Sequence, residues 1–208
     1  MLCRLFKRCL NIPYTHVENS GDYALERMGE HLYVYLECSN GIEDWQNNFD
    51  FVAKPYKNMQ GDFLAHGGFV KVWKSIVDHI SPVILDQRYK KITIVGYSHG
   101  AALAVLCHEY AVFHRFDIRD EIFGYGFGCP RVIYGRKTAV HEQIWKGFTV
   151  IRNIDDMVTH LPPSVIGFFH VGKMLEIGEK GKYSRIDAHR PQNILRELKL
   201  YETHYSKT

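Results

Sequence analysis

The sequence predicts an α/β fold with a mostly parallel central sheet and helices on both faces. Short apolar runs, which have the length of strands, alternate along the chain with longer amphipathic segments of helical period. This alternation is typical of strands and helices packed as layers. The 208 residues contain no internal repeat, low-complexity tract or linker. Because a chain of this length can enclose a substantial core, we expect residues 1–208 to form a single domain.

The first elements are predicted from turn residues and from the spacing of apolar residues. Residues 23–38 read as a β-hairpin that turns at Gly29-Glu30, since two apolar runs flank a short glycine-containing turn. A helix is expected over 68–87, where apolar residues recur at three- and four-residue steps. These residues are Phe69, Val72, Trp73, Ile76, Val77 and Ile80.

Strands and helices continue to alternate through the rest of the chain. In order, we expect a strand at 91–95, a helix that ends near residue 114, strands at 122–128, 148–152 and 173–178, and a closing helix over 190–205. Pro191 is compatible with the closing helix, because the first turn of a helix needs no N–H donor. In a parallel sheet of this kind, binding sites form at the carboxyl ends of the strands.

Charge and hydropathy exclude two classes of protein. A net charge of +3 and an isoelectric point near 8.5, without a dense basic stripe, predict no binding to nucleic acid. No stretch approaches the roughly 18 apolar residues that cross a bilayer. Residues 1–12 have two interpretations: a segment docked on the domain, which we favour, or an anchor at a membrane surface. The apolar face of that anchor would comprise Leu2, Leu5, Phe6, Cys9 and Leu10.

The cysteines bear on the compartment in which the protein works. The chain has five, at positions 3, 9, 38, 107 and 129, with no Cys-x-x-Cys pair. An odd and scattered set indicates free thiols in a reducing compartment, and neither a disulfide framework nor a zinc site. The first residues also lack the apolar run of a signal peptide. We therefore expect a cytoplasmic location.

The most informative motif is Gly96-Tyr97-Ser98-His99-Gly100, which lies between an apolar strand and an Ala/Leu-rich helix. A sharp strand-to-helix turn of this type exposes a serine hydroxyl for attack on a carbonyl. We expect Gly96 and Gly100 to lie where the turn crowds the backbone and a Cβ would clash. The alternative is an ordinary glycine-rich turn whose serine caps the helix.

A nucleophilic serine requires a histidine that accepts its proton and an acid that orients the histidine. The acid candidates are Asp155 and Asp156, directly after the strand at 148–152. The histidine candidates that follow them are His170, His189 and His204. Residue types alone leave both choices open.

Five blocks together carry a family resemblance, in the order in which they occur along the chain. They are Asp44-Trp45-x-x-Asn48, His66-Gly67-Gly68-Phe69, Gly96 to Ala104, Phe127-Gly128-Cys129-Pro130-Arg131-Val132 and Asn153 to Pro163. In this order they resemble the fungal-type (class 3) lipase family of α/β-hydrolases. The chain departs from the family at Thr159, where proline is usual, and by placing one residue between Asp187 and His189.

The resemblance implies a role for particular residues. It favours Asp156 as the acid and His189 as the base, and His170 matches a structural histidine of the family. The oxyanion hole would combine the backbone N–H of His99 with Ser39. The segment 40–48, which contains Trp45, takes the place of the family's lid and is short and polar.

The sequence thus predicts a serine carboxylic-ester hydrolase, a lipase or esterase, acting through Ser98, Asp156 and His189. Its substrate would be a small-molecule or lipid ester, with no metal or other cofactor, and peripheral membrane contact and the oligomeric state stay open. One alternative is a phospholipase held at a membrane by residues 1–12. Another is a hydrolase scaffold that binds without catalysis.

Overall fold

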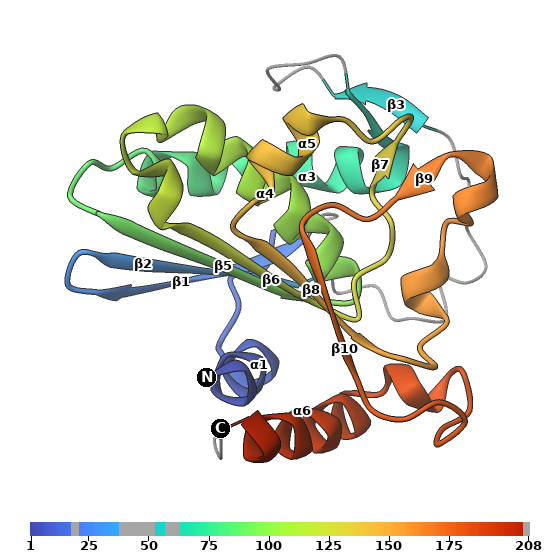
Figure 1. The fold of residues 1–208 in the computed structure, drawn as a ribbon. Coiled ribbons are helices and arrows are strands. Elements are labelled where there is room, and N and C mark those ends of the chain that lie inside the picture. Colours follow the sequence, from blue (N-terminus) through green and yellow to red (C-terminus); the bar gives the residue numbers. More distant parts are fainter. Residues whose placement is uncertain (18–20, 38–52, 57–62, 206–208) are drawn as a thin grey trace.

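A six-stranded sheet forms the centre of the fold (Figure 1). The computed structural model describes residues 1–17, 21–37, 53–56 and 63–205. The strand order is β1 (Asp22–Met28), β2 (His31–Glu37), β5 (Lys91–Tyr97), β6 (Ile122–Phe127), β8 (Phe148–Asn153) and β10 (Lys173–Ile177). Only the pair β1–β2 is antiparallel within this sheet, and the other neighbours run parallel. The predicted mostly parallel sheet is therefore confirmed.

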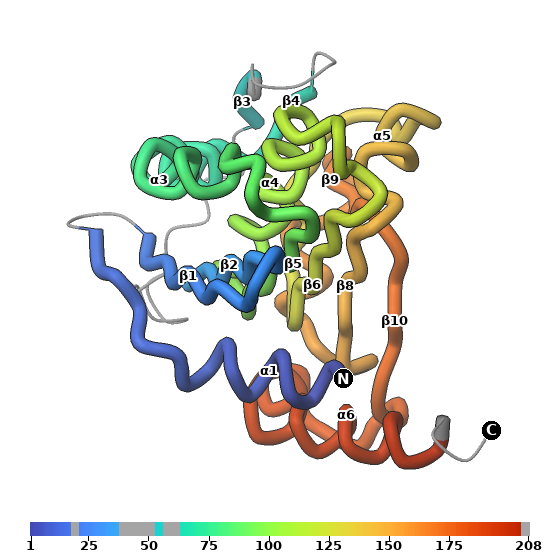
Figure 2. The backbone as a smooth tube through the Cα atoms, turned by 90° about the vertical axis from the view of Figure 1, so that its left-hand side faces the viewer, coloured from blue at the N-terminus to red at the C-terminus, as the bar shows by residue number. Residues whose placement is uncertain are grey.

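Helices cover both faces of the sheet, as predicted. On one face lie α3 (Gly67–Ile84), α4 (His99–His114) and α5 (Ala139–Ile144), and on the other lie α1 (Leu2–Asn11) and α6 (Pro191–Tyr205). Figure 2 shows α1 and α6 side by side beneath the strands. Short 3₁₀ helices occupy connections: η1 (Phe116–Glu121), η2 (Val158–His160), η3 (Ser164–Ile166) and η4 (Asp187–His189).

A second, antiparallel sheet was not predicted. It contains β3 (Ala53–Tyr56), β4 (Phe63–His66), β7 (Ile133–Tyr134) and β9 (Phe168–Phe169). Strands of two to four residues are too short to show the alternation of apolar and polar residues by which a strand is recognised in sequence. Tertiary packing, and not local pattern, defines this sheet.

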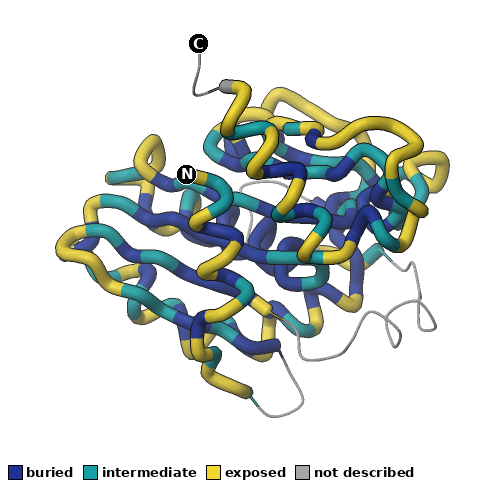
Figure 3. Tube along the Cα trace, turned by 90° about the horizontal axis from the view of Figure 1, so that it is seen from below, coloured by how far each residue is buried: buried dark blue, intermediate teal, exposed yellow. Residues whose placement is uncertain are grey.

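Helix α4 lies at the centre of the larger core. Its small residues, such as Ala101 and Ala104, are fully buried and let the helix approach β5 and β6 closely. The opposite face of the sheet has its own core, a cluster that contains Phe6, Phe127 and Leu198. Figure 3 shows buried residues along the middle of the strands and exposed residues at the turns. The sheet is thus covered on both faces along β5 and β6, the two strands that end next to Ser98.

Helix α1 uses its apolar face to pack on the protein. The exposed fraction is 7% for Leu5, 0% for Phe6 and 3% for Cys9. The ammonium group of Met1 also lies 2.7 Å from a carboxylate oxygen of Glu202 in α6. The structure agrees with the docked interpretation of residues 1–12, because Leu5, Phe6 and Cys9 are buried in the core and Leu2 and Leu10 are partly buried against it. No helix in the described part of the chain is long and apolar enough to span a bilayer.

Candidate active site

The glycine–serine motif forms the predicted sharp turn between β5 and α4. Ser98 stands between the last residue of the strand and the first residue of the helix, with φ 54° and ψ −119°. A positive φ is uncommon for a residue with a side chain, and Ser98 is the single such non-glycine residue in the described part of the chain. The Ser98 N–H donates to the carbonyl of Phe127 at 2.9 Å, which ties the turn to β6.

The two flanking glycines are required by crowding. A Cβ on Gly96 would lie 2.1 Å from the carbonyl oxygen of Gly100, and one on Gly100 would lie 2.0 Å from that of Leu36. Both distances are below any van der Waals contact, and both neighbours are backbone atoms that cannot rotate away. The expectation that a Cβ would clash at both positions is confirmed.

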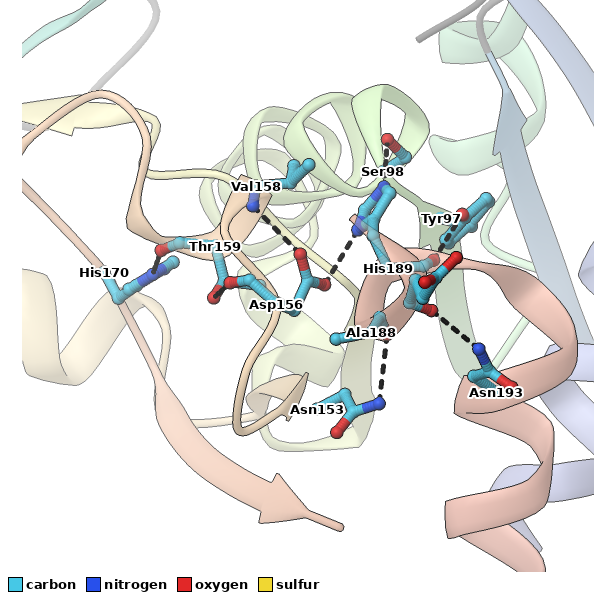
Figure 4. Close-up of polar contacts among 11 residues, drawn as sticks. Tyr97, Ser98, Asn153, Asp156, Val158, Thr159, His170, Ala188, His189 and Asn193 are labelled. Carbon is cyan, nitrogen blue, oxygen red and sulfur yellow. Dashed lines mark hydrogen bonds and ion pairs between the residues drawn. The ribbon is translucent and has the colours of Figure 1, made fainter. Parts of the chain in front are cut away.

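Ser98, His189 and Asp156 form a continuous chain of hydrogen bonds (Figure 4). His189 Nε2 lies 2.8 Å from Ser98 Oγ, and His189 Nδ1 lies 2.7 Å from Asp156 Oδ2. An ionised carboxylate can only accept, so Nδ1 carries the ring proton and donates it to Asp156. Nε2 is then left to accept the hydrogen bond of the Ser98 hydroxyl, as a general base must.

Asp156, at the acid end of these hydrogen bonds, is buried from solvent and held by two hydrogen-bond donors. Asp156 is 0% exposed and His189 is 2% exposed. The Asp156 Oδ1 atom accepts a hydrogen bond from the backbone N–H of Val158 at 2.9 Å. The backbone carbonyl of Asp156 accepts one from the Thr159 hydroxyl at 2.8 Å. The carboxylate is therefore fixed in direction before any substrate arrives.

Two further residues hold the backbone of the histidine segment, and neither was predicted to do so. The Asn153 side-chain amide donates to the carbonyl of Ala188 at 3.0 Å, and the Tyr97 hydroxyl donates to the carbonyl of His189 at 2.7 Å. Both lie within the family-like motifs, Asn153 as the first residue of its block and Tyr97 next to the serine. Membership of those motifs is the sequence signal that could have identified them.

The other acid and histidine candidates make different contacts. His170 Nε2 lies 2.7 Å from the carbonyl oxygen of Thr159, and burial lowers the pKa of this imidazole to about 4. Asp155 accepts a hydrogen bond from the Gly181 N–H at 2.7 Å. His204 is exposed in the last turn of α6. The structure thus brings one predicted acid and one predicted histidine to Ser98.

The predicted oxyanion donors are partly described. His99 is the first residue of α4, and the first N–H groups of a helix lack acceptors within it. The imidazole of His99 packs edge-on against Phe69 at 4.9 Å, and burial together with His66 lowers its pKa to about 4. Ser39 and the segment 40–48 with Trp45 lie outside the described residues. Among the described residues, no group of His, Cys, Asp and Glu side chains could hold a metal ion.

The relatives that this chain matches are fungal lipases. The chain is 29% identical to a lipase of Rhizomucor miehei over 150 residues, which cover 68% of this chain and 40% of that protein. It is 30% identical to a secreted mono- and diacylglycerol lipase of Malassezia globosa over 123 residues, which cover 53% of this chain and 37% of that protein. The chain therefore spans about two fifths of the length of these relatives.

Solved structures show the same fold. The triacylglyceride lipase of Rhizomucor miehei superposes with a TM-score of 0.67, at 24% identity, over 81% of this chain and 66% of that one. A fungal lipase–inhibitor complex, the source of a model for interfacial activation in lipases, gives a TM-score of 0.69, at 21% identity, over 86% of this chain and 78% of that one. The architecture is that of the α/β-hydrolases.

The relatives contradict the predicted cytoplasmic location, because the matching Malassezia lipases are secreted proteins. The location that we expected from the unpaired cysteines was wrong for a physical reason. Cys9, Cys107 and Cys129 are buried, and burial raises the pKa of the Cys9 thiol to about 12. A buried and protonated thiol behaves as a small apolar side chain, so it persists unpaired in any compartment.

The family is shown by the extent of the sequence match. The profile described as lipase (class 3) matches residues 33–166, which is more than half of the chain. This range contains the serine turn and Asp156, and His189 follows it. The chain belongs to the class 3 lipase family.

Proposed function

We propose that this protein hydrolyses carboxylic esters of lipids through a covalent acyl-enzyme intermediate. The observation that carries the proposal is the unbroken hydrogen-bond chain Ser98–His189–Asp156 at the start of α4. A nucleophile bonded to a base, which is in turn oriented by a buried acid, is the arrangement that activates a serine hydroxyl. The same arrangement argues against a scaffold that only binds.

Catalysis would proceed in two halves around His189. Ser98 Oγ attacks the acyl carbonyl while His189 Nε2 takes the hydroxyl proton, and that proton then passes to the alkoxide oxygen of the leaving alcohol. The acyl group stays on Ser98 as an ester. Water then loses a proton to Nε2 and attacks this ester, which releases the carboxylic acid and returns the proton to Ser98.

Asp156 would act on the charge that His189 acquires in each half. The carboxylate is buried, so its attraction for the imidazolium is screened less than it would be in water. Its second oxygen is occupied by the Val158 N–H, which stops the carboxylate from turning away. Asp156 thereby keeps His189 in the tautomer that can accept a proton from Ser98.

The oxyanion would be stabilised by the N–H of His99, at the N-terminus of α4, with Ser39 as the second donor. Donors fixed in advance at the position of the developing charge contribute about 3–4 kcal/mol each to transition-state stabilisation. Both His99 and the positive end of the helix dipole lie directly after the nucleophile in the chain. The substrate oxygen would therefore lie over the first turn of α4.

Acylglycerols and similar esters are the proposed substrates, acted on outside the cell. This proposal follows the relatives, of which the Malassezia proteins are secreted mono- and diacylglycerol lipases. A phospholipase anchored by residues 1–12 is disfavoured, because Leu5, Phe6 and Cys9 already pack inside the protein. Any contact with a lipid surface must use other residues.

Replacing Ser98 by alanine is expected to lower kcat by at least about 10⁴-fold, since the remaining groups cannot form the acyl-enzyme. Hydrolysis of p-nitrophenyl esters of increasing acyl length, and of mono-, di- and triacylglycerols and a phosphatidylcholine, measures both activity and preference. Ser75→Ala, which makes the same change on an exposed part of α3, is expected to keep full activity. Equal activity in the wild type and in a folded Ser98→Ala variant would refute the proposal.

A further inference from the structure

Tyr97 contacts the histidine segment in two ways. Its hydroxyl donates to the carbonyl of His189 at 2.7 Å. Its ring also stacks on the imidazole, with centroids 5.1 Å apart and planes 23° from parallel. Figure 4 shows Tyr97 beside His189, next to Ser98 at the end of β5. One side chain therefore restrains both the backbone and the ring of His189.

His189 needs such a restraint because no strand holds it. It ends the 3₁₀ helix η4, a single short turn directly before α6. Its ring must nevertheless keep hydrogen-bond distance to two partners from different elements, Ser98 and Asp156. Misplacement of a catalytic group by about 1 Å can cost about 100-fold in rate.

Phe6 of α1 packs against the ring of Tyr97. The two rings meet edge to face, with centroids 5.5 Å apart and planes 65° from parallel. Phe6 is 0% exposed and also stacks on Phe127 at 4.5 Å. The carbonyl of Phe127 is the acceptor for the Ser98 N–H. Phe6 therefore contacts the residues on β5 and β6 that lie next to the nucleophile.

We propose that Tyr97 is a positioning residue for His189 and that Phe6 holds Tyr97 in place, which makes α1 part of the scaffold of the active site. The proposal rests on the proposed catalytic function of Ser98 and His189. It gives the N-terminal helix a role in catalysis that does not involve a membrane. It also gives a function to the tyrosine of this chain's Gly-Tyr-Ser-His-Gly motif.

The surroundings of Tyr97 keep its hydroxyl a donor. Burial, followed by the negative charge of Asp156, raises the pKa of Tyr97 well above its ordinary value. The phenol therefore stays protonated throughout the pH range in which His189 could act as a base. Its hydrogen bond to the His189 carbonyl is available at every such pH.

Three variants separate the hydrogen bond, the stacking and the support from α1. Tyr97→Phe is expected to lower kcat about tenfold, Tyr97→Leu about 100-fold, and Phe6→Leu about fivefold, each with KM nearly unchanged. Tyr125→Leu is the matched control, because Tyr125 belongs to the same apolar cluster on the neighbouring strand β6. It is expected to lower the melting temperature but not kcat.

A double variant tests whether Phe6 acts through Tyr97. In the Tyr97→Leu background, Phe6→Leu should have little further effect on kcat, because coupled residues are not additive. Multiplication of the two separate effects would overturn the coupling to α1. A decrease in kcat of equal size in Tyr97→Leu and Tyr125→Leu would overturn the positioning role itself.

A spectroscopic measurement keeps this test independent of activity. The low-field proton NMR signal of the His189 Nδ1–H, bonded to Asp156, reports the placement of the imidazole even if no ester is hydrolysed. The signal is expected to weaken or broaden in Tyr97→Leu and to persist in Tyr125→Leu and Ser98→Ala. An unchanged signal in Tyr97→Leu would overturn the proposal, whereas wild-type inactivity with the expected NMR pattern would refute only the proposed hydrolysis.

Discussion

Asp156→Asn is expected to lower kcat for ester hydrolysis by about 10⁴-fold while the protein stays folded. The asparagine oxygen can still accept from the Val158 N–H, so the side chain keeps its place. Its NH₂ group then faces His189 Nδ1 as a donor, which forces the ring proton onto Nε2. A protonated Nε2 cannot accept the proton of Ser98. Steady-state kinetics on a p-nitrophenyl ester measure the decrease.

The neighbouring carboxylate provides the control for this change. Asp155→Asn makes the same substitution one residue earlier, where the side chain binds the Gly181 N–H and not a histidine. We expect this variant to keep kcat within about twofold of wild type, as for a surface substitution away from the reacting groups. A large decrease in Asp155→Asn and a small one in Asp156→Asn would reverse the assignment of the acid.

Glu109→Gln is expected to stabilise the protein, and to do so more strongly as the pH rises. Glu109 lies in α4 and is 1% exposed, and within the described part of the chain neither of its carboxyl oxygens has a hydrogen-bond partner. Burial raises its pKa from an ordinary value of 4.5 to about 9. Glutamine has nearly the same shape and carries no charge, so it removes the free-energy cost of burying the ionised carboxylate.

The direction of the effect follows from proton binding. Between these two pKa values the folded protein keeps the Glu109 proton and the unfolded chain loses it, so the contribution of Glu109 to the free energy of unfolding decreases as pH rises, by about 1.4 kcal/mol per pH unit. Below this range both states are protonated and the penalty vanishes. The advantage of Glu109→Gln should therefore grow by about 4 kcal/mol between about pH 5 and about pH 8.

Urea unfolding of both proteins at the two pH values measures this difference. Glu142→Gln serves as the control, because that side chain is 67% exposed and its replacement should give the same change at both pH values. An advantage of Glu109→Gln that does not depend on pH would mean that the Glu109 carboxyl is not held neutral in the folded protein.

Local patterns in the sequence predicted those turns, strands and helices whose formation depends on residues that are close together in the sequence. The turn around Ser98 follows from two glycines between a β-branched run and an Ala-rich run, and the structure has that turn. The strands and helices of the central sheet follow in the same way from apolar periodicity. The choice of Asp156 over Asp155 needed the family motif, because both carboxylates stand at the same strand end.

Contacts between distant residues were not predictable from the same patterns. Tyr97 and His189 are 92 positions apart, and nothing in either local sequence signals their contact. The apolar face of residues 1–12 was visible in the sequence, but the pattern could not distinguish a core from a membrane as the medium that covers it. The packing of Phe6 against Phe127 favours the core.

The positive φ of Ser98 lowers the thermal stability of the protein at the residue whose hydroxyl group its activity requires. A side chain in this conformation costs about 1–3 kcal/mol, and glycine adopts it without that cost. Directed evolution that selects for thermal tolerance alone would therefore enrich glycine at position 98 and discard the nucleophile. A library built on this protein has to be screened for hydrolysis and stability together.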